Sequence, residues 1–361
     1  PVLSVEFLSR FGKTVFQGKS AKLERKPPRA GKLEMRKASW PVAGSQLLFT
    51  IGKGGVGKTT TTAGLAFRGR ATQKNVPVNV CSTDPAPSLD DVFQQEIGNR
   101  RSAVLGDPRL GAIEVDSIAE FRRWAGEIRN KLDSDLSMEA GGLHVDLSFE
   151  KQVFAALMEV VPPGVDEVFA IFRIMELLKE SQARAPGRQQ QSRVLIDMAP
   201  TGHALELLRM PERMLLWSRL LLKSLAAHRT LALAQDVAVE LASLGQRVRS
   251  LIALMKDPQQ SRVVAVMLPE PAPDRQTMRL LRAVADIGST VDSIFVNRVL
   301  VEDVDDCKHC LRRRGWQIAS LLGFRKKYPG HTAYLIKEFS GEIAGAAGLR
   351  KLTKQLWQIA E

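Results

Sequence analysis

The sequence predicts an α/β fold in which a mostly parallel sheet is flanked by helices and carries a helical subdomain. Short apolar or β-branched runs of the kind that form buried strands recur along the chain, with longer helical patterns between most of them. This alternation is typical of a parallel sheet with helices on both faces. The predicted strands are LLFTI (47–51), VPVNVCS (76–82), GAIEV (111–115), RVLIDMA (193–199), RVVAVML (262–268), SIFVNRV (293–299) and AYLIKEF (333–339).

Two intervals contain more helical pattern than the connections between parallel strands require. Residues 117–192 and 203–257 show amphipathic periodicity, and we interpret them as a helical subdomain that grows out of the edge of the sheet. The polar stretch ARAPGRQQQSR (183–193) would lead the chain back to the sheet. The sheet and the subdomain together form one predicted domain over residues 46–361.

Residues 1–45 form a separate basic extension. They contain ten Lys or Arg and three Glu, a net charge of +7, whereas the whole chain of 361 residues carries +13. Because the excess charge does not cover the domain itself, the sequence gives no sign of a nucleic-acid groove. The extension has three interpretations: a solvated arm, a segment that contacts anionic lipid, or an organelle-targeting segment.

The composition predicts a cytoplasmic protein, for which peripheral membrane contact stays possible. No window holds the about 18 uninterrupted apolar residues of a membrane span, and the N-terminus lacks the apolar region of a secretory signal. Three cysteines are too few for a disulfide framework, which favours a reducing compartment.

The stretch FTIGKGGVGKTT (49–60) contains the pattern G-x-x-x-x-G-K-[ST] of a phosphate-binding P-loop. Glycines let backbone N–H groups face phosphate oxygens, and the helix that follows adds the positive end of its dipole. Lys58 would reach the β- and γ-phosphates of ATP, and the Thr59 hydroxyl would ligate Mg²⁺. The fold class is therefore that of the P-loop NTPases. The predicted nucleotide-binding residues of this loop are Gly52, Lys53, Gly54, Gly55, Val56, Gly57, Lys58, Thr59 and Thr60.

The additional lysine, Lys53, distinguishes this loop from an ordinary P-loop. The sequence GKGGVGKTT resembles the deviant P-loop of dimeric ATPases related to nitrogenase iron protein and MinD. The resemblance implies a homodimer in which Lys53 crosses to the partner's nucleotide as a catalytic residue. A lysine in that position would stabilise the charge that develops on the transferred phosphoryl group.

Three further stretches narrow the resemblance to one family. STDPAPSLDDVF (82–93), DMAPTGHALELL (197–208) and EFSGEIAGAAGLRKL (338–352) look like the arsenite-pump ATPase family, ArsA, and the resemblance runs from about Leu47 to the C-terminus. One branch of this family delivers tail-anchored membrane proteins in the guided-entry pathway, and another drives arsenite efflux. The resemblance implies ATP hydrolysis with Mg²⁺ as the cofactor.

The resemblance also implies roles for residues that follow the predicted strands. Asp84 would orient or deprotonate the attacking water, in a first switch with Pro85. Asp197 would hold Mg²⁺ together with Thr59. From the residues alone, either aspartate could instead cap the turn or helix that follows it. The second switch would comprise Asp197, Thr201, Gly202 and His203, and the nucleotide contacts outside the P-loop would be Asn297, the adenine-binding residue, and Phe339.

Cys307 and Cys310 form a C-x-x-C pair, which is half of a tetrahedral zinc site. Two such pairs would complete the site across the two-fold axis of a dimer, and the targeting branch of the family uses the same pair in this way. A redox-active pair and two inert cysteines are the alternatives that stay open. Cys81 lies alone in a predicted strand and is expected to be a buried thiol.

The predicted helical subdomain carries apolar stripes that contain several methionines, which suit a groove for varied hydrophobic helices. From the sequence alone, ordinary packing among amphipathic helices is the favoured explanation of the same stripes. The stripes lie at 153–161, 165–178, 204–225 and 242–255 and include Met158, Met175, Met210, Met214 and Met255.

We therefore predict a homodimeric ATPase whose nucleotide state controls the binding of hydrophobic, tail-anchored membrane-protein clients, with a membrane receptor as a further partner. The first alternative is the ATPase subunit of an arsenite efflux pump, with a permease as partner, although residues 117–257 contain no cysteine that could bind As(III). The second alternative is a holdase chaperone controlled by the redox state of the C-x-x-C pair.

Overall fold

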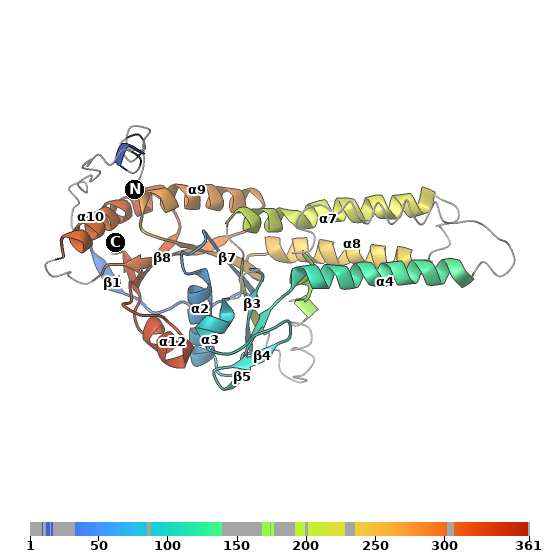
Figure 1. Cartoon of the computed structure of the whole chain (residues 1–361), viewed down its shortest axis with the longest axis horizontal. Helices are drawn as coiled ribbons and strands as arrows, with labels where there is room; N and C mark the ends of the chain where they lie inside the picture. Colours follow the sequence, from blue (N-terminus) through green and yellow to red (C-terminus); the bar gives the residue numbers. More distant parts are fainter. Residues whose placement is uncertain are drawn as a thin grey trace.

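The computed structural model describes residues 9, 12–14, 16, 33–84, 88–138, 168–173, 175–176, 192–198, 201–227, 235–301 and 307–359. These residues form one ten-stranded sheet with helices packed against it, and a helical arm extends from one end (Figure 1). The strand order is β1-β10-β9-β8-β7-β2-β6-β3-β5-β4. The predicted α/β fold with a mostly parallel sheet is confirmed.

The inner part of the sheet, from β9 to β5 in that order, is parallel. It contains every strand that the sequence predicts: β2 (Leu47–Gly52), β3 (Val78–Ser82), β5 (Asp107–Glu114), β6 (Arg193–Asp197), β7 (Ser261–Met267), β8 (Val291–Val299) and β9 (Thr332–Lys337). The sequence does not predict the antiparallel edge strands β1 (Met35–Lys37), β4 (Ser102–Val104) and β10 (Trp357–Ile359).

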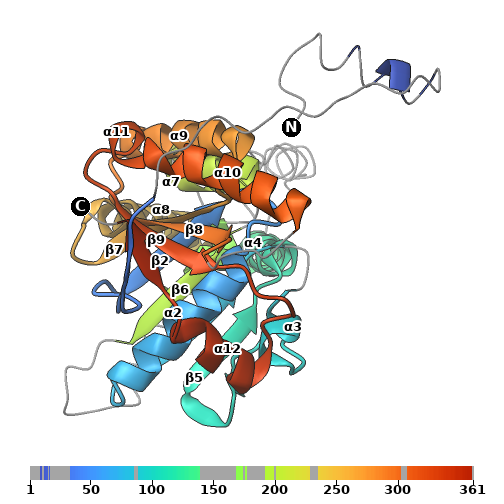
Figure 2. The ribbon, with the colours of Figure 1, turned by 90° about the vertical axis from the view of Figure 1, so that its left-hand side faces the viewer.

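Alternate strand residues point to opposite faces of the sheet, and each face has its own apolar layer. On one face, Leu47 and Phe49 pack with residues of α7 (Thr201–Ala227), α8 (Gln235–Lys256), α9 (Pro271–Asp286), α10 (Lys308–Leu322) and α11 (Phe324–Lys327). On the other face, Leu48 and Val80 pack with α2 (Lys58–Thr72), α3 (Leu89–Phe93) and α12 (Gly345–Thr353). Figure 2 shows the sheet between these two helical layers.

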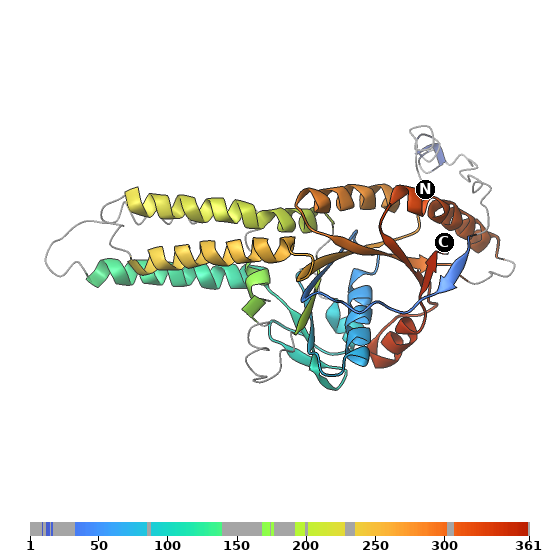
Figure 3. The ribbon, with the colours of Figure 1, turned by 180° about the vertical axis from the view of Figure 1, so that it is seen from behind.

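The helical arm consists of α4 (Ser117–Met138), α7 and α8, which run side by side away from the sheet (Figures 1 and 3). All three helices fall within the predicted helical intervals, apart from the first residues of α7. Aromatic rings fill the arm near the sheet, where Trp124 lies 5.0 Å from Phe169 and 5.8 Å from Trp217 between ring centroids. No helix in the described ranges combines the length and apolar character that a membrane span requires.

The methionines of the arm lie mostly in its interior. Met210, Met214 and Met255 are buried in the main apolar cluster, and Met175 packs against it, so ordinary helix packing accounts for these four residues. Met158 lies outside the described residues. Among the side chains of the arm that the structure describes, the exposed large apolar ones are Leu216, Leu220, Val239 and Ile118.

Residues at the end of the predicted basic extension take part in the fold. β1 pairs with β10, with Met35 opposite Ile359. Trp40 is only 2% exposed and lies 5.4 Å from Phe295 between ring centroids. A Cβ atom at Gly64 of α2 would lie 3.0 Å from the Trp40 ring, so the glycine leaves room for it. The solvated-arm interpretation is therefore wrong for this segment, because Trp40 anchors it beneath α2.

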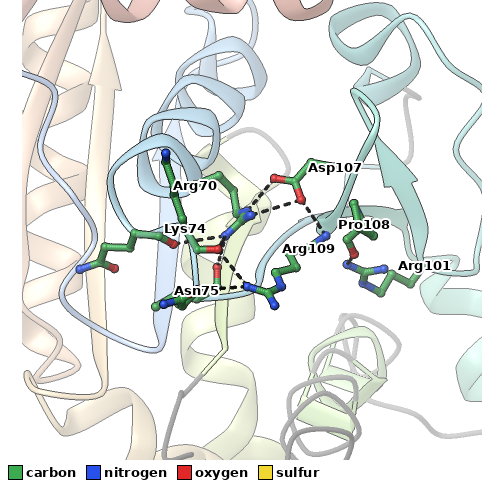
Figure 4. Close-up of polar contacts among 9 residues, drawn as sticks. Arg70, Lys74, Asn75, Arg101, Asp107, Pro108 and Arg109 are labelled. Carbon is green, nitrogen blue, oxygen red and sulfur yellow. Dashed lines mark hydrogen bonds and ion pairs between the residues drawn. The ribbon is translucent and has the colours of Figure 1, made fainter.

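The C-terminal end of α2 is fixed to the start of β5 by Arg70 (Figure 4). Its guanidinium donates to both carboxylate oxygens of Asp107, at 2.8 and 3.2 Å. It also donates to the carbonyl oxygens of Lys74 and Val76, which lie just after the helix, at 2.9 and 2.8 Å. Bidentate pairing of this kind is geometrically specific. The C-terminal end of the helix that begins at the P-loop is thus held against the start of β5.

Candidate active site

The P-loop connects β2, in the middle of the sheet, to α2. Gly55 and Gly57 have φ angles of 75° and 90°, in the left-handed region that glycine adopts without strain. A Cβ atom at Gly52 would overlap the carbonyl oxygen of Val266 on β7, so this position also requires glycine. Gly57 has no side chain to cap α2, which leaves the first N–H groups of the helix available to an anion.

The two lysines of the P-loop point in different directions. Lys58 is 6% exposed, and its Nζ lies 3.5 Å from the Lys53 carbonyl oxygen, so the ammonium is folded back over the loop. Lys53 itself is exposed. Lys58 is therefore placed to contact phosphate bound by its own loop, and Lys53 faces away from the protein interior.

Thr59 lies next to Asp197, which ends β6. The Thr59 hydroxyl donates to Asp197 Oδ2 at 2.5 Å. Burial raises the pKa of Asp197 to about 6, although the Thr59 hydrogen bond and the Lys58 charge act in the opposite direction. Asp197 Oδ1 is buried and has no hydrogen-bond partner among the described residues.

This pair of oxygen ligands fits the Mg²⁺ that an ATPase requires. Hydroxyl and carboxylate oxygens are hard ligands of the type that Mg²⁺ prefers. A divalent cation or its bound water would satisfy the unpaired Oδ1 of Asp197 and would favour the ionised carboxylate. Thr59 and Asp197 are brought together as the sequence predicts, and they are the residues that would hold the ion.

Asp84 follows β3 and reaches the same site. It is half-buried, and its amide donates to Ser82 Oγ at 3.2 Å. At the other end of the short loop, Ser88 Oγ lies 3.0 Å from Thr59 Oγ1. Pro85 of the predicted first switch lies outside the described residues. Of the predicted second switch, Thr201, Gly202 and His203 form the start of α7, just after Asp197.

A cavity of about 800 Å³ lies above these residues, at the carboxyl ends of the parallel strands. That volume is in the range of small-molecule sites. The predicted residues that line it are Gly54, Gly55, Gly57, Lys58, Thr59, Thr60, Asp84, Asn297 and Phe339. Gly52 and Val56 are buried in the P-loop. The lining residues that sequence analysis does not identify are Ser88, Asp91, Val92, Arg298, Ile336, Lys337, Glu338, Gly341, Glu342, Ile343 and Leu352.

Asn297 closes the cavity at the P-loop side. Its Nδ2 donates to the Val56 carbonyl oxygen at 2.9 Å, and a Cβ atom at Gly57 would overlap this amide. Arg298 follows in the left-handed conformation, with a φ of 57°. The Gln317 side chain of α10 holds this backbone, because it donates to the Arg298 carbonyl oxygen at 3.0 Å and accepts from the Leu300 amide at 2.9 Å.

A second side chain of α10 contacts the loop after β9. Arg313 donates to both carboxylate oxygens of Glu338, at 2.9 and 2.8 Å. The next residue, Phe339, is half-buried, and the Lys351 ammonium lies 5.7 Å from the centre of its ring. Ile336, Phe339 and Ile343 give this end of the cavity apolar surface, which suits a nucleotide base, and Arg313 of α10 contacts the loop that carries Phe339.

The C-x-x-C pair lies at the start of α10. Cys307 is exposed and caps the helix, since its Sγ accepts a hydrogen bond from the Cys310 amide at 3.4 Å. Hydrogen bonds from the Cys310 backbone and thiol lower the pKa of Cys307. Within the described residues, no group of three or more His, Cys, Asp or Glu is arranged to hold a metal. Cys81 is buried in β3, and burial raises the pKa of its thiol.

Comparison with known proteins agrees with this arrangement. The ArsA family model, described as anion-transporting ATPase, matches residues 45–358. ATPase GET3 of Clavispora lusitaniae is 26% identical over 328 residues, which cover 86% of this chain and 88% of that protein. ATPase GET3 of Zygosaccharomyces rouxii is 28% identical over 336 residues (86% and 89%), and ATPase GET3C of Arabidopsis thaliana is 30% identical over 329 residues (85% and 81%). The chain belongs to the ArsA family of anion-transporting ATPases and is an ATP-hydrolysing enzyme.

Proposed function

We propose that the protein is a homodimeric, Mg²⁺-dependent ATPase of the cytoplasm that binds the hydrophobic helices of tail-anchored membrane proteins and hands them to a membrane receptor. The observation that carries this proposal is the continuity between the nucleotide site and the arm. β6 ends at Asp197, and α7 begins at Thr201 and continues to Ala227 along the arm. A displacement at the γ-phosphate would therefore reach the arm through one helix.

Each residue of the nucleotide site has a separate role in the proposed hydrolysis. In this proposal, Lys58 binds the phosphates of its own chain, and Asp84 accepts a hydrogen bond from the attacking water. The exposed position of Lys53 supports a role toward the nucleotide of the partner subunit. Mg²⁺, held at Thr59 and Asp197, would neutralise charge on the phosphate oxygens when bound. Asn297 and Phe339 contact the base.

The apolar client contact begins on α7. Leu216 and Leu220 are 60% and 56% exposed and lie one helical turn apart, so their side chains are neighbours on the helix surface. Val239 of α8 is also exposed, by 68%. Large aliphatic side chains in adjacent exposed positions are suited to contact with another apolar helix.

Client binding can be tested with a fluorescent peptide that carries a hydrophobic tail-anchor helix, in ADP and in a non-hydrolysable ATP analogue. The parental protein should bind the peptide with different affinities in the two nucleotides. Leu216→Ser/Leu220→Ser should weaken binding about tenfold or more. Two leucines that become buried against the client contribute at least about 1.4 kcal/mol to the contact. The matched variant Arg219→Ser/Lys223→Ser has the same spacing on α7 and should keep the parental affinity.

Two other results would overturn the client proposal. Equal affinity for the peptide in both nucleotide states would mean that the nucleotide does not control client binding. Stimulation of ATP hydrolysis by arsenite, without any binding of the peptide, would favour a subunit of an arsenite pump instead.

We further propose that Cys307 and Cys310 of two chains bind one structural Zn²⁺ between the subunits. Metal analysis should find about one zinc per two chains, because four thiolates complete a tetrahedral site. Cys307→Ser/Cys310→Ser should contain no zinc and should dissociate to monomers at higher protein concentration. Cys81→Ala removes the buried cysteine and should keep both zinc and dimer. Zinc that persists at parental content in the double variant would exclude this site.

A further inference from the structure

Glu114 carries a half-buried carboxylate to which none of the proposals above gives a role. It is the last residue of β5, and its Oε1 accepts hydrogen bonds from the amides of Ser88 and Leu89 at 3.0 and 3.1 Å. Ser88 in turn contacts Thr59, which would ligate Mg²⁺. We propose that Glu114 and Ser88 are positioning residues, which hold the loop that carries Asp84 on the magnesium side of the P-loop.

The two ends of this loop are attached to neighbouring strand ends. Ser82 of β3 and Glu114 of β5 are register partners in the parallel sheet. Ser82 Oγ accepts from the Asp84 amide at the start of the loop, and Glu114 accepts from the Ser88 amide at its end. In addition, the Thr83 amide donates to the Asp197 carbonyl oxygen at 3.1 Å. The Asp84 amide is thus anchored to the end of β3, and the Ser88 amide, four residues further along the chain, is anchored to the end of β5.

The hydroxyl groups between the loop and the P-loop have only one consistent arrangement. Thr59 has a single hydroxyl hydrogen, and it is donated to Asp197 Oδ2. Since Ser88 Oγ lies 3.0 Å from Thr59 Oγ1, Ser88 must donate to the Thr59 oxygen. One lone pair of that oxygen is then left for Mg²⁺. Ser88 therefore orients the lone pair with which Thr59 would ligate the ion.

The series of hydrogen bonds joins the groups that hydrolysis needs at the same moment. Glu114 fixes Ser88, Ser88 orients Thr59, and Thr59 contacts Asp197. Because only three residues separate Asp84 from Ser88, the anchoring of Ser88 also limits where Asp84 can lie relative to the P-loop. Loss of Glu114 should therefore affect the orientation of Asp84, and loss of Ser88 should chiefly affect the use of Mg²⁺.

The first arm of the test measures turnover. Glu114→Ala should lower kcat about tenfold at saturating ATP and Mg²⁺, which corresponds to the loss of about one hydrogen bond to a charged group. Glu114→Gln keeps an oxygen that accepts from both amides and should restore most of the turnover. The KM for ATP should stay near the parental value, because the phosphate-binding residues are not altered.

The second arm measures Mg²⁺ directly, without hydrolysis. Binding of a fluorescent ATP analogue is titrated with Mg²⁺, and Ser88→Ala should raise the Mg²⁺ concentration for half-maximal binding about tenfold. Ser88→Thr keeps the hydroxyl and should restore the parental value. Thermal melting of all four variants shows whether any change comes from unfolding.

The inference rests on the proposed role of Asp84. A double variant distinguishes the positioning role of Glu114 from the catalytic role of Asp84. In an Asp84→Asn chain, Glu114→Ala should cause no further loss of kcat, since the group that it positions is already disabled. Full activity of Asp84→Asn would refute the catalytic role of Asp84 and leave the Ser88 titration as the test of positioning. Parental kcat in Glu114→Ala, parental Mg²⁺ dependence in Ser88→Ala, or no rescue by Gln and Thr would overturn the inference.

Discussion

The Asp84→Asn variant is expected to bind Mg²⁺ and ATP with parental affinity and to hydrolyse ATP about 10²- to 10⁴-fold more slowly, the range for loss of a positioned general base. An amide is a poor acceptor for the proton of water, but it has nearly the same size as the carboxylate. Asp84 lines the cavity but is not one of the residues that we assign to the base, so the contacts of Asn297 and Phe339 to the base should survive. Single-turnover hydrolysis and a nucleotide titration measure the two effects separately.

The same variant tests the dimer when it is mixed with Lys53→Ala, which is expected to be inactive by itself. In a mixed dimer, the nucleotide held by the Lys53→Ala chain has its own Asp84 and receives Lys53 from the other chain. That site should hydrolyse ATP, whereas the other site lacks both groups. Mixed dimers should recover about half of the parental activity if the two sites act independently.

Two results would contradict this scheme. No recovery in mixed dimers, verified by mass, would mean that Lys53 serves the nucleotide of its own chain or that both sites must act together. An Asp84→Asn homodimer with parental turnover would remove Asp84 from the chemistry.

Trp40→Ala is expected to lower the free energy of unfolding by about 3–5 kcal/mol, the usual cost of truncating a buried tryptophan. The ring is enclosed between Phe295 of the sheet and Gly64 of α2, so its removal leaves a cavity beneath the P-loop helix. Urea denaturation should show a lower midpoint with an unchanged slope.

Trp40→Phe provides the control for this prediction. The indole Nε1 is buried without a hydrogen-bond partner in the part of the chain that the structure describes, so its removal loses no such bond. The phenylalanine ring keeps the contact with Phe295, and the cost should stay below about 1.5 kcal/mol. If the alanine variant is as stable as the parent, residues 33–45 do not contribute to the core.

Elements that are marked by a pattern of neighbouring residues could be predicted from the sequence. The seven parallel strands are buried on both faces, and their continuous apolar runs are visible without any knowledge of their neighbours. The same is true of the P-loop, in which glycines and lysine follow one another within a few residues. β1, β4 and β10 have three residues each, and nothing in MRK or WQI distinguishes an edge strand from a turn.

Residues that act through contacts distant in the sequence could not be predicted. Asp84, Asp197 and Asn297 follow or end recognisable strands, and the family resemblance supplied their roles. Glu114 also ends a recognised strand, but its partner Ser88 is 26 residues away, and only the strand register brings the two together. The burial of Trp40 could not be predicted, because the basic residues around it are typical of a solvated arm.

The contacts that Gln317 and Arg313 make with the loops of the cavity have a thermodynamic consequence. α10 begins at the C-x-x-C pair, and its side chains Arg313 and Gln317 contact Glu338 and the Arg298 backbone at the cavity. One helix therefore connects the two cysteines with the nucleotide cavity. Whatever binds the cysteines and shifts this helix also changes the free energy of nucleotide binding. Linkage is reciprocal, and ATP must then change the affinity of that ligand by the same factor. Zinc titrations with and without ATP would measure a single coupling constant from either end.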